Sequence, residues 1–421
     1  MLAVVLVLAV VVVLVVAGPG VGGTSSGVLS GSRHSPRSGR TSAPVLRERL
    51  PAVMRFPGRP ARLPFPVKGE AAVVIPGLGV VGASPAERQV SIASLTKMMT
   101  AYIILKDHPL SMWGNGPVFQ MTAADHANWV FAAIRGESNL EVKKGERLDE
   151  RQLLEALMIP SADNIANYLA VWDAGSLPRF VAKMNAEAAH LGLVSTHYAD
   201  ASGLDPRSRS TAVDQAMLAG ITMTDPVLRS IVDNIYVMLP IAGRVWNVYN
   251  PAIGVDGIIG VKSGFTHAAQ ACLATAAWRI VGGRRYLVVS TVLGVRLGLR
   301  QAAHVDEALL EAVSKELSVQ TVLPRGAAVA TAVAPWDGRS VEAALSGGPL
   351  RLAGWPGLAF RPAVIPIFHA RSVGGGRWPA GVTVGTLELS TAASTETVGR
   401  VVLQEGLPAP PVGWVPSPPA S

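Results

Sequence analysis

Ser94 and Lys97 lie three residues apart in the segment "SLTK", at the start of a run of apolar residues with helical spacing. Side chains at positions i and i+3 share one face of a helix. A lysine that is held there and partly desolvated can lose its proton near neutral pH and activate a serine hydroxyl. Backbone amides at the helix start would favour a developing oxyanion. The same spacing also fits a capping serine beside a surface lysine, so the pair needs support from other residues.

Two further segments supply residues that suit the same chemistry. "PSADNIA" places Ser161 at a break between two helical patterns, where a side chain can point into a cleft. "GVKSGFT" places Lys262 at the edge of a predicted strand, followed by the small residues Ser263 and Gly264. The lysine could hold a carboxylate, and the small residues would let the backbone of a substrate approach. We therefore expect all three segments to meet in one site.

The segments "SLTK", "SADN" and "KSG" occur in the order of S-x-x-K, S-D-N and K-T-G, the signature of penicillin-binding proteins and serine β-lactamases. Linking segments such as "MIPSADNIANYLA" and "DGIIGVKSGFT" extend the likeness. Between about residues 65 and 316, the chain resembles the serine-type D-alanyl-D-alanine carboxypeptidases of the low-molecular-mass penicillin-binding protein family.

This resemblance implies a function in cell-wall synthesis and remodelling, with a role for each motif residue. Ser94 would attack a peptidoglycan stem peptide ending in D-Ala-D-Ala and become acylated as the terminal D-alanine leaves. Lys97 would act as general base and Ser161 would relay protons, with no cofactor. β-Lactams would trap the same serine, and the backbone amides of Ser94 and Phe265 would form the oxyanion hole. The residues that the resemblance assigns to substrate binding are Lys262, Ser263, Gly264, Phe265, Thr266, Asp163 and Asn164.

The second motif departs from the family pattern, which has asparagine two residues after the serine. Here that position is Asp163, and Asn164 follows it. An asparagine amide can donate a hydrogen bond, whereas an ionised aspartate only accepts. Near Lys97 and Lys262, a charged Asp163 would keep both lysines protonated and weaken the base. Either the chain shifts locally to present Asn164, or activity is reduced or redirected.

Three alternative functions remain open at this point. A class A β-lactamase would carry a deacylating glutamate in an E-x-x-L-N segment, and no such segment lies between the second and third motifs. A D,D-endopeptidase would use the same residues on cross-linked peptides. A catalytically weakened envelope protein that binds peptidoglycan would also accommodate Asp163.

The order of predicted elements indicates an α+β fold. Short β-like runs precede the first motif, helical patterns follow, and strands and a last helix close the unit. We expect an antiparallel sheet with flanking helices, β-lactamase/penicillin-binding-protein-like, over residues 65–321. Residues 322–405 have short apolar runs broken by glycine and proline and predict a small β-rich domain. Residues 406–421 are proline-rich and predict a disordered tail.

The composition of the N-terminal part predicts export. Residues 1–23 are almost wholly apolar and predict a signal peptide or membrane anchor, so we expect an extracytoplasmic location. Residues 24–64 are rich in Ser, Pro, Gly and Arg and predict a flexible basic linker. Most of the net charge of +8 comes from this segment, so it does not indicate a nucleic-acid partner. The single cysteine excludes an internal disulfide, and the scattered histidines do not suggest a metal site.

Overall fold

The centre of the fold is a five-stranded antiparallel sheet in the order β11-β12-β13-β3-β4. The two longest strands are joined by Gly282 and Gly283, which have φ angles of 58° and 78° and form a two-residue hairpin turn, as adjacent glycines between two apolar runs favour. The strands of this sheet are β3 (Glu70–Ile75), β4 (Gly79–Ala83), β11 (Ile258–Thr266), β12 (Gln270–Val281) and β13 (Arg284–Val295).

The protein is described by a computed structural model that covers residues 44–60, 62–247, 253–367, 377–412 and 414. The predicted signal peptide or anchor and half of the proline-rich tail lie outside these residues. In the described part of the chain, no helix is both long enough and apolar enough to cross a membrane.

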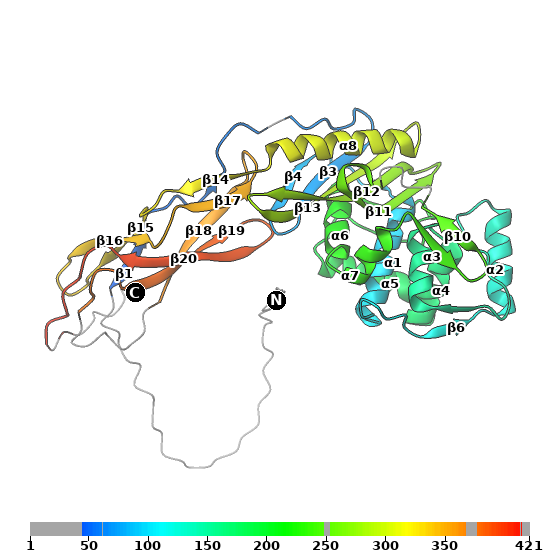
Figure 1. Ribbon diagram of the computed structural model, residues 1–421, viewed down its shortest axis with the longest axis horizontal. Helices are drawn as coiled ribbons and strands as arrows, with labels where there is room; N and C mark the ends of the chain where they lie inside the picture. The colour runs from blue at the N-terminus through cyan, green and yellow to red at the C-terminus, as the bar shows by residue number, and fades with distance from the viewer. Residues whose placement is uncertain (1–43, 61, 248–252, 368–376, 413, 415–421) are drawn as a thin grey trace, which may run out of the picture. The chain divides into compact units, whose positions relative to one another are not determined.

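Helices cover both faces of the sheet. The alternation of side chains along a strand sends Ala71 and Val73 into one core and Ala72 and Val74 into the other. Helix α8 covers the first face, and α6 packs on the second (Figure 1). The helices are α1 (Thr96–Asp107), α2 (Ala123–Ile134), α3 (Glu150–Met158), α4 (Asp163–Ala174), α5 (Leu177–His190), α6 (Ala212–Thr222), α7 (Pro226–Val232) and α8 (Leu299–Glu316).

Short elements connect the sheet to the helices. The 3-10 turns are η1 (Ala93–Leu95) and η2 (Val255–Gly257). Three small strand pairs brace the helical part, namely β5 (Val90–Ser91) with β8 (Arg209–Ser210), β6 (Val118–Gln120) with β7 (Arg147–Asp149), and β9 (Tyr236–Leu239) with β10 (Gly243–Trp246). The predicted α+β fold, an antiparallel sheet with flanking helices, is confirmed.

After α8 the described residues are almost all β-structure. A seven-stranded sheet has the order β1-β15-β16-β20-β19-β18-β2, and a separate pair joins β14 to β17. These strands are β1 (Val45–Glu48), β2 (Met54–Arg55), β14 (Ser318–Leu323), β15 (Ala328–Val333), β16 (Ser340–Leu345), β17 (Leu350–Gly354), β18 (Ala359–Pro366), β19 (Thr383–Ser390) and β20 (Thr395–Leu403).

The described part of the predicted linker contains two strands of this β-rich region. β1 pairs antiparallel with β15, and β2 pairs with β18. Leu46 packs against the core of the β-rich region while Arg47 and Arg49 are exposed. Charged side chains are common on the open face of an edge strand. In the sequence, the arginines of β1 resemble those of a flexible linker, and they obscure the alternation of buried and exposed residues along the strand. From residue 44 onward, the flexible-linker prediction is therefore corrected.

Candidate active site

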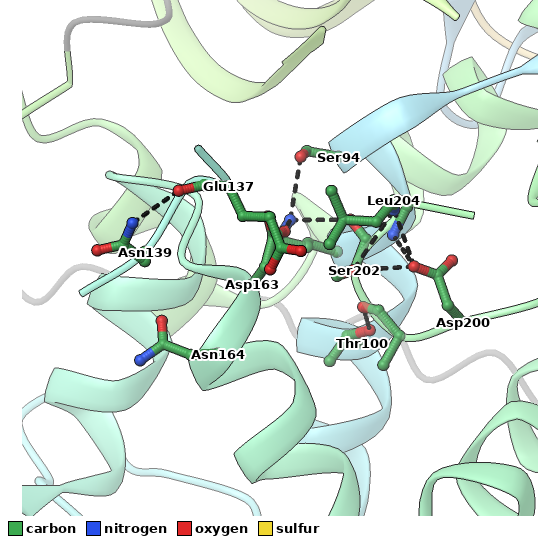
Figure 2. Close-up of polar contacts among 12 residues, drawn as sticks. Ser94, Thr100, Glu137, Asn139, Asp163, Asn164, Asp200, Ser202 and Leu204 are labelled. Atoms are coloured by element: carbon green, nitrogen blue, oxygen red, sulfur yellow. Dashed lines mark hydrogen bonds and ion pairs between the residues drawn. The ribbon is translucent and has the colours of Figure 1, made fainter. Parts of the chain in front are cut away.

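The Lys97 ammonium is the centre of a buried hydrogen-bond network. Its Nζ lies 3.0 Å from Ser94 Oγ, 2.5 Å from Asp163 Oδ1 and 2.8 Å from the carbonyl oxygen of Ser202 (Figure 2). Lys97 has no exposed surface, and Asp163 is 2% exposed. The first and second motifs, 66 residues apart in the chain, therefore meet at one amine.

The turn that carries Ser94 fits tightly between two glycines. A Cβ atom on Gly264 of β11 would lie 2.7 Å from the backbone nitrogen of Ser94, and one on Gly203 would lie 1.8 Å from the carbonyl oxygen of Ala93. Ala93 itself has a φ angle of 47°, in the left-handed region that costs a non-glycine residue energy. The third motif thus contributes the strand against which the Ser94 turn packs.

The loop after α5 presents the carbonyl group that Lys97 binds. Asp200 Oδ2 accepts hydrogen bonds from the Ser202 hydroxyl and from the amides of Gly203 and Leu204. The hydroxyl of Thr100 donates to the carbonyl of Ala201 at 2.7 Å and ties the loop to α1. None of the predicted site residues lies in this segment, "DASGLDPRSRS". The aspartate followed by serine and glycine was a signal, because this pattern is typical of turns closed by a side-chain carboxylate.

Asp163, and not Asn164, faces the site. The Asn164 amide pairs with the backbone of Leu140, accepting from its nitrogen and donating to its oxygen at 3.0 Å each. In Figure 2 the Asn164 side chain points away from Ser94. Because α4 begins at Asp163, adjacent residues point in different directions around the helix and both cannot face Lys97. Of the two alternatives for the second motif, the structure does not show the local shift that would present Asn164, because the Asn164 amide is paired with Leu140 and not directed to substrate binding.

Two lysines share the one carboxylate of Asp163. Burial raises the pKa of Asp163, while the positive charge of Lys97 and, to a lesser degree, of Lys262 opposes the rise. Burial, with a contribution from Lys97, holds the pKa of the Lys262 amine well below its usual range. Lys262 Nζ donates to the carbonyl of Ser263 at 2.8 Å. This set of buried charges favours an incoming anion that would compensate Lys262.

The remaining motif residues line β11 and the turn before α4. Ser263 is buried, whereas Phe265 is about half exposed. The Thr266 hydroxyl oxygen accepts from the amide of Ala269 at 3.0 Å, which leaves its hydrogen free for a ligand. Ser161 has a φ angle of 65° and is 3% exposed, and its hydroxyl has no hydrogen-bond partner among the described residues. A strained residue with an unpaired buried hydroxyl is typical of a functional site.

The sheet with its flanking helices and the Ser94–Lys97 pair define the penicillin-binding-protein class of folds. The family model described as D-alanyl-D-alanine carboxypeptidase, peptidase S11, matches residues 69–296. The chain belongs to this family, and the resemblance that the motifs indicate is confirmed.

Characterised relatives match over part of their length. The D-alanyl-D-alanine carboxypeptidase DacB2 of Mycobacterium tuberculosis is 38% identical over 160 residues, which are 37% of this chain and 54% of that protein. The D-alanyl-D-alanine carboxypeptidase DacD of Salmonella typhimurium is 30% identical over 233 residues, 52% of this chain and 55% of that protein. The chain thus spans about half the length of these curated relatives.

Solved structures share the fold. The D-alanyl-D-alanine carboxypeptidase DacD of Francisella tularensis aligns with a TM-score of 0.58 at 19% identity, over 83% of this chain and 96% of that one. Penicillin-binding protein 5 of Haemophilus influenzae aligns with a TM-score of 0.57 at 17% identity, over 83% and 99% of the two chains. Both alignments are longer than the family match, so the likeness in fold extends beyond residues 69–296.

Proposed function

We propose that the protein is a serine-type D-alanyl-D-alanine carboxypeptidase, which removes the terminal D-alanine from peptidoglycan stem peptides. The observation that carries this proposal is the 3.0 Å contact between Ser94 Oγ and Lys97 Nζ in a chain of this family. The names of the curated relatives support the substrate class. A fully buried amine beside a serine hydroxyl is the arrangement that nucleophile activation requires.

In the proposed acylation step, Ser94 Oγ attacks the carbonyl carbon of the penultimate D-alanine and its proton passes to Lys97. The C–N bond breaks, and the leaving amine takes a proton that Ser161 relays from the lysine. D-Alanine departs with its own carboxylate. A water molecule then hydrolyses the ester on Ser94 and restores the hydroxyl, so protons and bonds balance over the cycle.

The substrate carboxylate is assigned to the end of β11. The hydroxyls of Ser263 and Thr266 would donate to it, and Lys262 would become an ammonium as it arrives, because an anion at close range favours the charged form of a buried amine. The amides of Ser94 and Phe265 would bind the carbonyl oxygen as it becomes negative.

A second candidate function rests on the contact between Asp163 and Lys97. The Asp163 carboxylate, 2.5 Å from the Lys97 amine, competes with Ser94 for the nitrogen that must accept the proton of the serine. This contact favours a weakened penicillin-binding protein that binds stem peptides and turns them over slowly, or one redirected to D,D-endopeptidase activity. The two functions differ in rate and in substrate, and they share the acylated serine.

We further propose that a β-rich domain follows the peptidase domain near residue 322. We also propose that the protein acts outside the cytoplasm, with the apolar segment at residues 1–23 as its signal peptide or membrane anchor. The curated relatives are named D-alanyl-D-alanine carboxypeptidases, and this name supports the location because the proposed stem-peptide substrates belong to the cell wall.

Two assays on the purified protein test the proposal. Fluorescent penicillin should label wild-type protein covalently, and a diacyl-D-Ala-D-Ala peptide should release D-alanine. Ser94→Ala should abolish both signals. Labelling without release would favour the weakened protein, and release only from cross-linked peptides would favour the endopeptidase. Wild-type protein that gives neither labelling nor release would refute the proposed activity.

A further inference from the structure

A cavity of about 540 Å³ lies between helices α2 and α4, beside the loop of residues 135–140. This volume is within the range of small-molecule sites. No step of the proposed reaction uses it. Its apolar wall comes mainly from both helices and from the start of α5, and includes Phe131, Ile165, Val171, Trp172 and Leu177.

Most charged and polar groups of the cavity are already paired within the protein. Arg135 Nε donates to Glu137 at 2.5 Å, so the two charges neutralise each other. The Asp125 carboxylate accepts from the amide and hydroxyl of Thr122 and caps α2. The cavity wall therefore carries one formal negative charge, that of Asp125, and among its described residues its one cation is already paired. An anionic ligand would lose its hydration there without gaining a full partner.

Three polar groups of the cavity wall stay free. The side-chain amides of Asn128 and Asn167 and the Tyr168 hydroxyl make no hydrogen bond within the part of the chain that the structure describes. An amide both donates and accepts, and a phenol can do either. These groups suit a neutral ligand that carries hydroxyl and amide groups of its own.

Aromatic rings stand beside these polar groups. Phe131 is 57% exposed on α2. Trp172 stacks on His108 with ring centroids 3.9 Å apart, so one of its faces is occupied. Phe131 is thus the ring most open to a ligand. Together, the open Phe131 ring and the free amides suit a ligand whose own ring is apolar on its faces and polar at its edge. Phe131 would contact a face of the ligand, and the amides would form hydrogen bonds with its edge.

We propose that this cavity binds an N-acetylated amino-sugar unit of a glycan strand. Such a sugar is neutral, has C–H groups on its ring faces and presents hydroxyl and acetamido groups at its edge. The choice of this sugar rests on the proposed function, because the stem peptides of peptidoglycan are attached to a strand of acetylated amino sugars.

The cavity shares a wall with the candidate active site. The carbonyl of Ser138 accepts from the Asp163 amide at 2.8 Å, and Leu140 pairs with Asn164, so the loop of residues 135–140 holds the first turn of α4. Asn139 fixes the same loop to α2 by accepting from Trp129 Nε1 at 2.9 Å. The loop that lines the cavity is thus linked through Asp163 to Lys97 of the candidate active site.

Direct binding tests the proposal without any need for turnover. Chitotetraose, a soluble oligomer of N-acetylglucosamine, is titrated into the full chain carrying Ser94→Ala, and binding is followed by calorimetry. The double change Asn128→Ala, Asn167→Ala and the single change Phe131→Ala should each weaken binding at least tenfold. Trp113→Ala removes an aromatic residue that is 88% exposed and does not line the cavity, and should leave binding unchanged.

The outcomes separate this proposal from the proposed function. Absence of chitotetraose binding, or equal binding by the cavity variants and Trp113→Ala, would overturn the sugar site even if Ser94 is acylated normally. Weakened binding of a sugar-free pentapeptide in the same variants, with no effect on chitotetraose, would assign the cavity to peptide and also overturn it. If penicillin does not label wild-type protein, the proposed enzymatic activity is refuted, and the sugar titration still tests the cavity independently. Thermal unfolding monitored by circular dichroism checks that each variant is folded.

Discussion

The carboxylate of Asp163 lies 2.5 Å from the amine of Lys97, and both residues are buried. Lys97 also contacts Ser94 Oγ, so the aspartate and the serine compete for the same nitrogen. A lysine nitrogen that is engaged by the Asp163 carboxylate is not free to accept the proton of Ser94. The rate of acylation should therefore depend on the strength of the contact between Asp163 and Lys97.

Asp163→Asn should raise activity near neutral pH. The change removes the negative charge beside the Lys97 amine and leaves a neutral amide of similar size, so the amine is freer to accept the proton of Ser94. We expect kcat/KM near neutral pH to rise about tenfold, which corresponds to about 1.4 kcal/mol. The measurement is D-alanine release from a diacyl-D-Ala-D-Ala peptide between pH 5 and 10.

Asp256→Asn is the control for this change, because that carboxylate is exposed on the surface and pairs with Arg279. If kcat/KM of Asp163→Asn near neutral pH is equal to or lower than that of wild type, Asp163 supports the base instead of restraining it.

Lys262→Met should weaken recognition of the substrate carboxylate. The low pKa of the buried Lys262 amine means that it gains most from an anion, and methionine fills the same space without a charge. A hydrogen bond to a charged group contributes about 1.5–3 kcal/mol, so kcat/KM should fall roughly 10- to 100-fold. A substrate whose terminal carboxylate is amidated should be hydrolysed equally slowly by both proteins. Equal losses on both substrates would point to a structural role for Lys262.

Gly264→Ala should slow acylation while the protein stays folded. The new Cβ would lie 2.7 Å from the Ser94 nitrogen and 3.1 Å from Ala93 Cβ, closer than atoms normally pack. The Ser94 turn would have to move away from β11, and displacement of a nucleophile by a fraction of an ångström costs about tenfold or more in rate. The measurement is the rate of labelling by fluorescent penicillin. Gly348→Ala, at an exposed position with open space around it and no positive φ angle, is the matched control; equal rates in wild type and Gly264→Ala would contradict the close fit.

The sequence predicted the contact within the first motif better than it predicted the surroundings of that motif. Ser94 and Lys97 share a face through local helical geometry, so their spacing sufficed. Asp200 was missed because its role is to fold a loop over α1, a long-range effect with no periodic signal. Asn164 was assigned to the site by motif position, but the start of α4 turns it toward Leu140.

The fold shows the same division between local and long-range effects. The alternation and turn residues of β12 and β13 predicted a hairpin, and the central sheet followed from it. The pairing of β1 with β15 joins residues almost 300 positions apart, and nothing in the arginine-rich segment indicates such a partner. The composition near Leu46 favoured a linker, because composition does not distinguish charged residues on the exposed face of a strand from charged residues in a flexible segment.

The buried Asp306 should make the stability of the protein depend on pH. This carboxyl group on α8 has no exposed surface, accepts from the Thr275 hydroxyl at 2.5 Å, and has a pKa that burial raises to about 6. Its ordinary value in an unfolded chain is about 3.9. Between these values the folded state binds more protons than the unfolded state, so this group makes the free energy of unfolding fall as the pH rises.

The contribution of Asp306 should fall by at most about 1.4 kcal/mol per pH unit from pH 4 to pH 6 and stay constant above that range. Asp306→Asn removes the ionisation and keeps a group that can contact Thr275. Burial also raises the pKa of Glu150 and Glu155, each to about 7, so wild type and variant must be compared at each pH. Urea unfolding at pH 4, 5, 6 and 7 gives the difference in free energy. Relative to the variant, wild type should lose stability up to pH 6; a constant difference across the four values would mean that Asp306 does not titrate in this range.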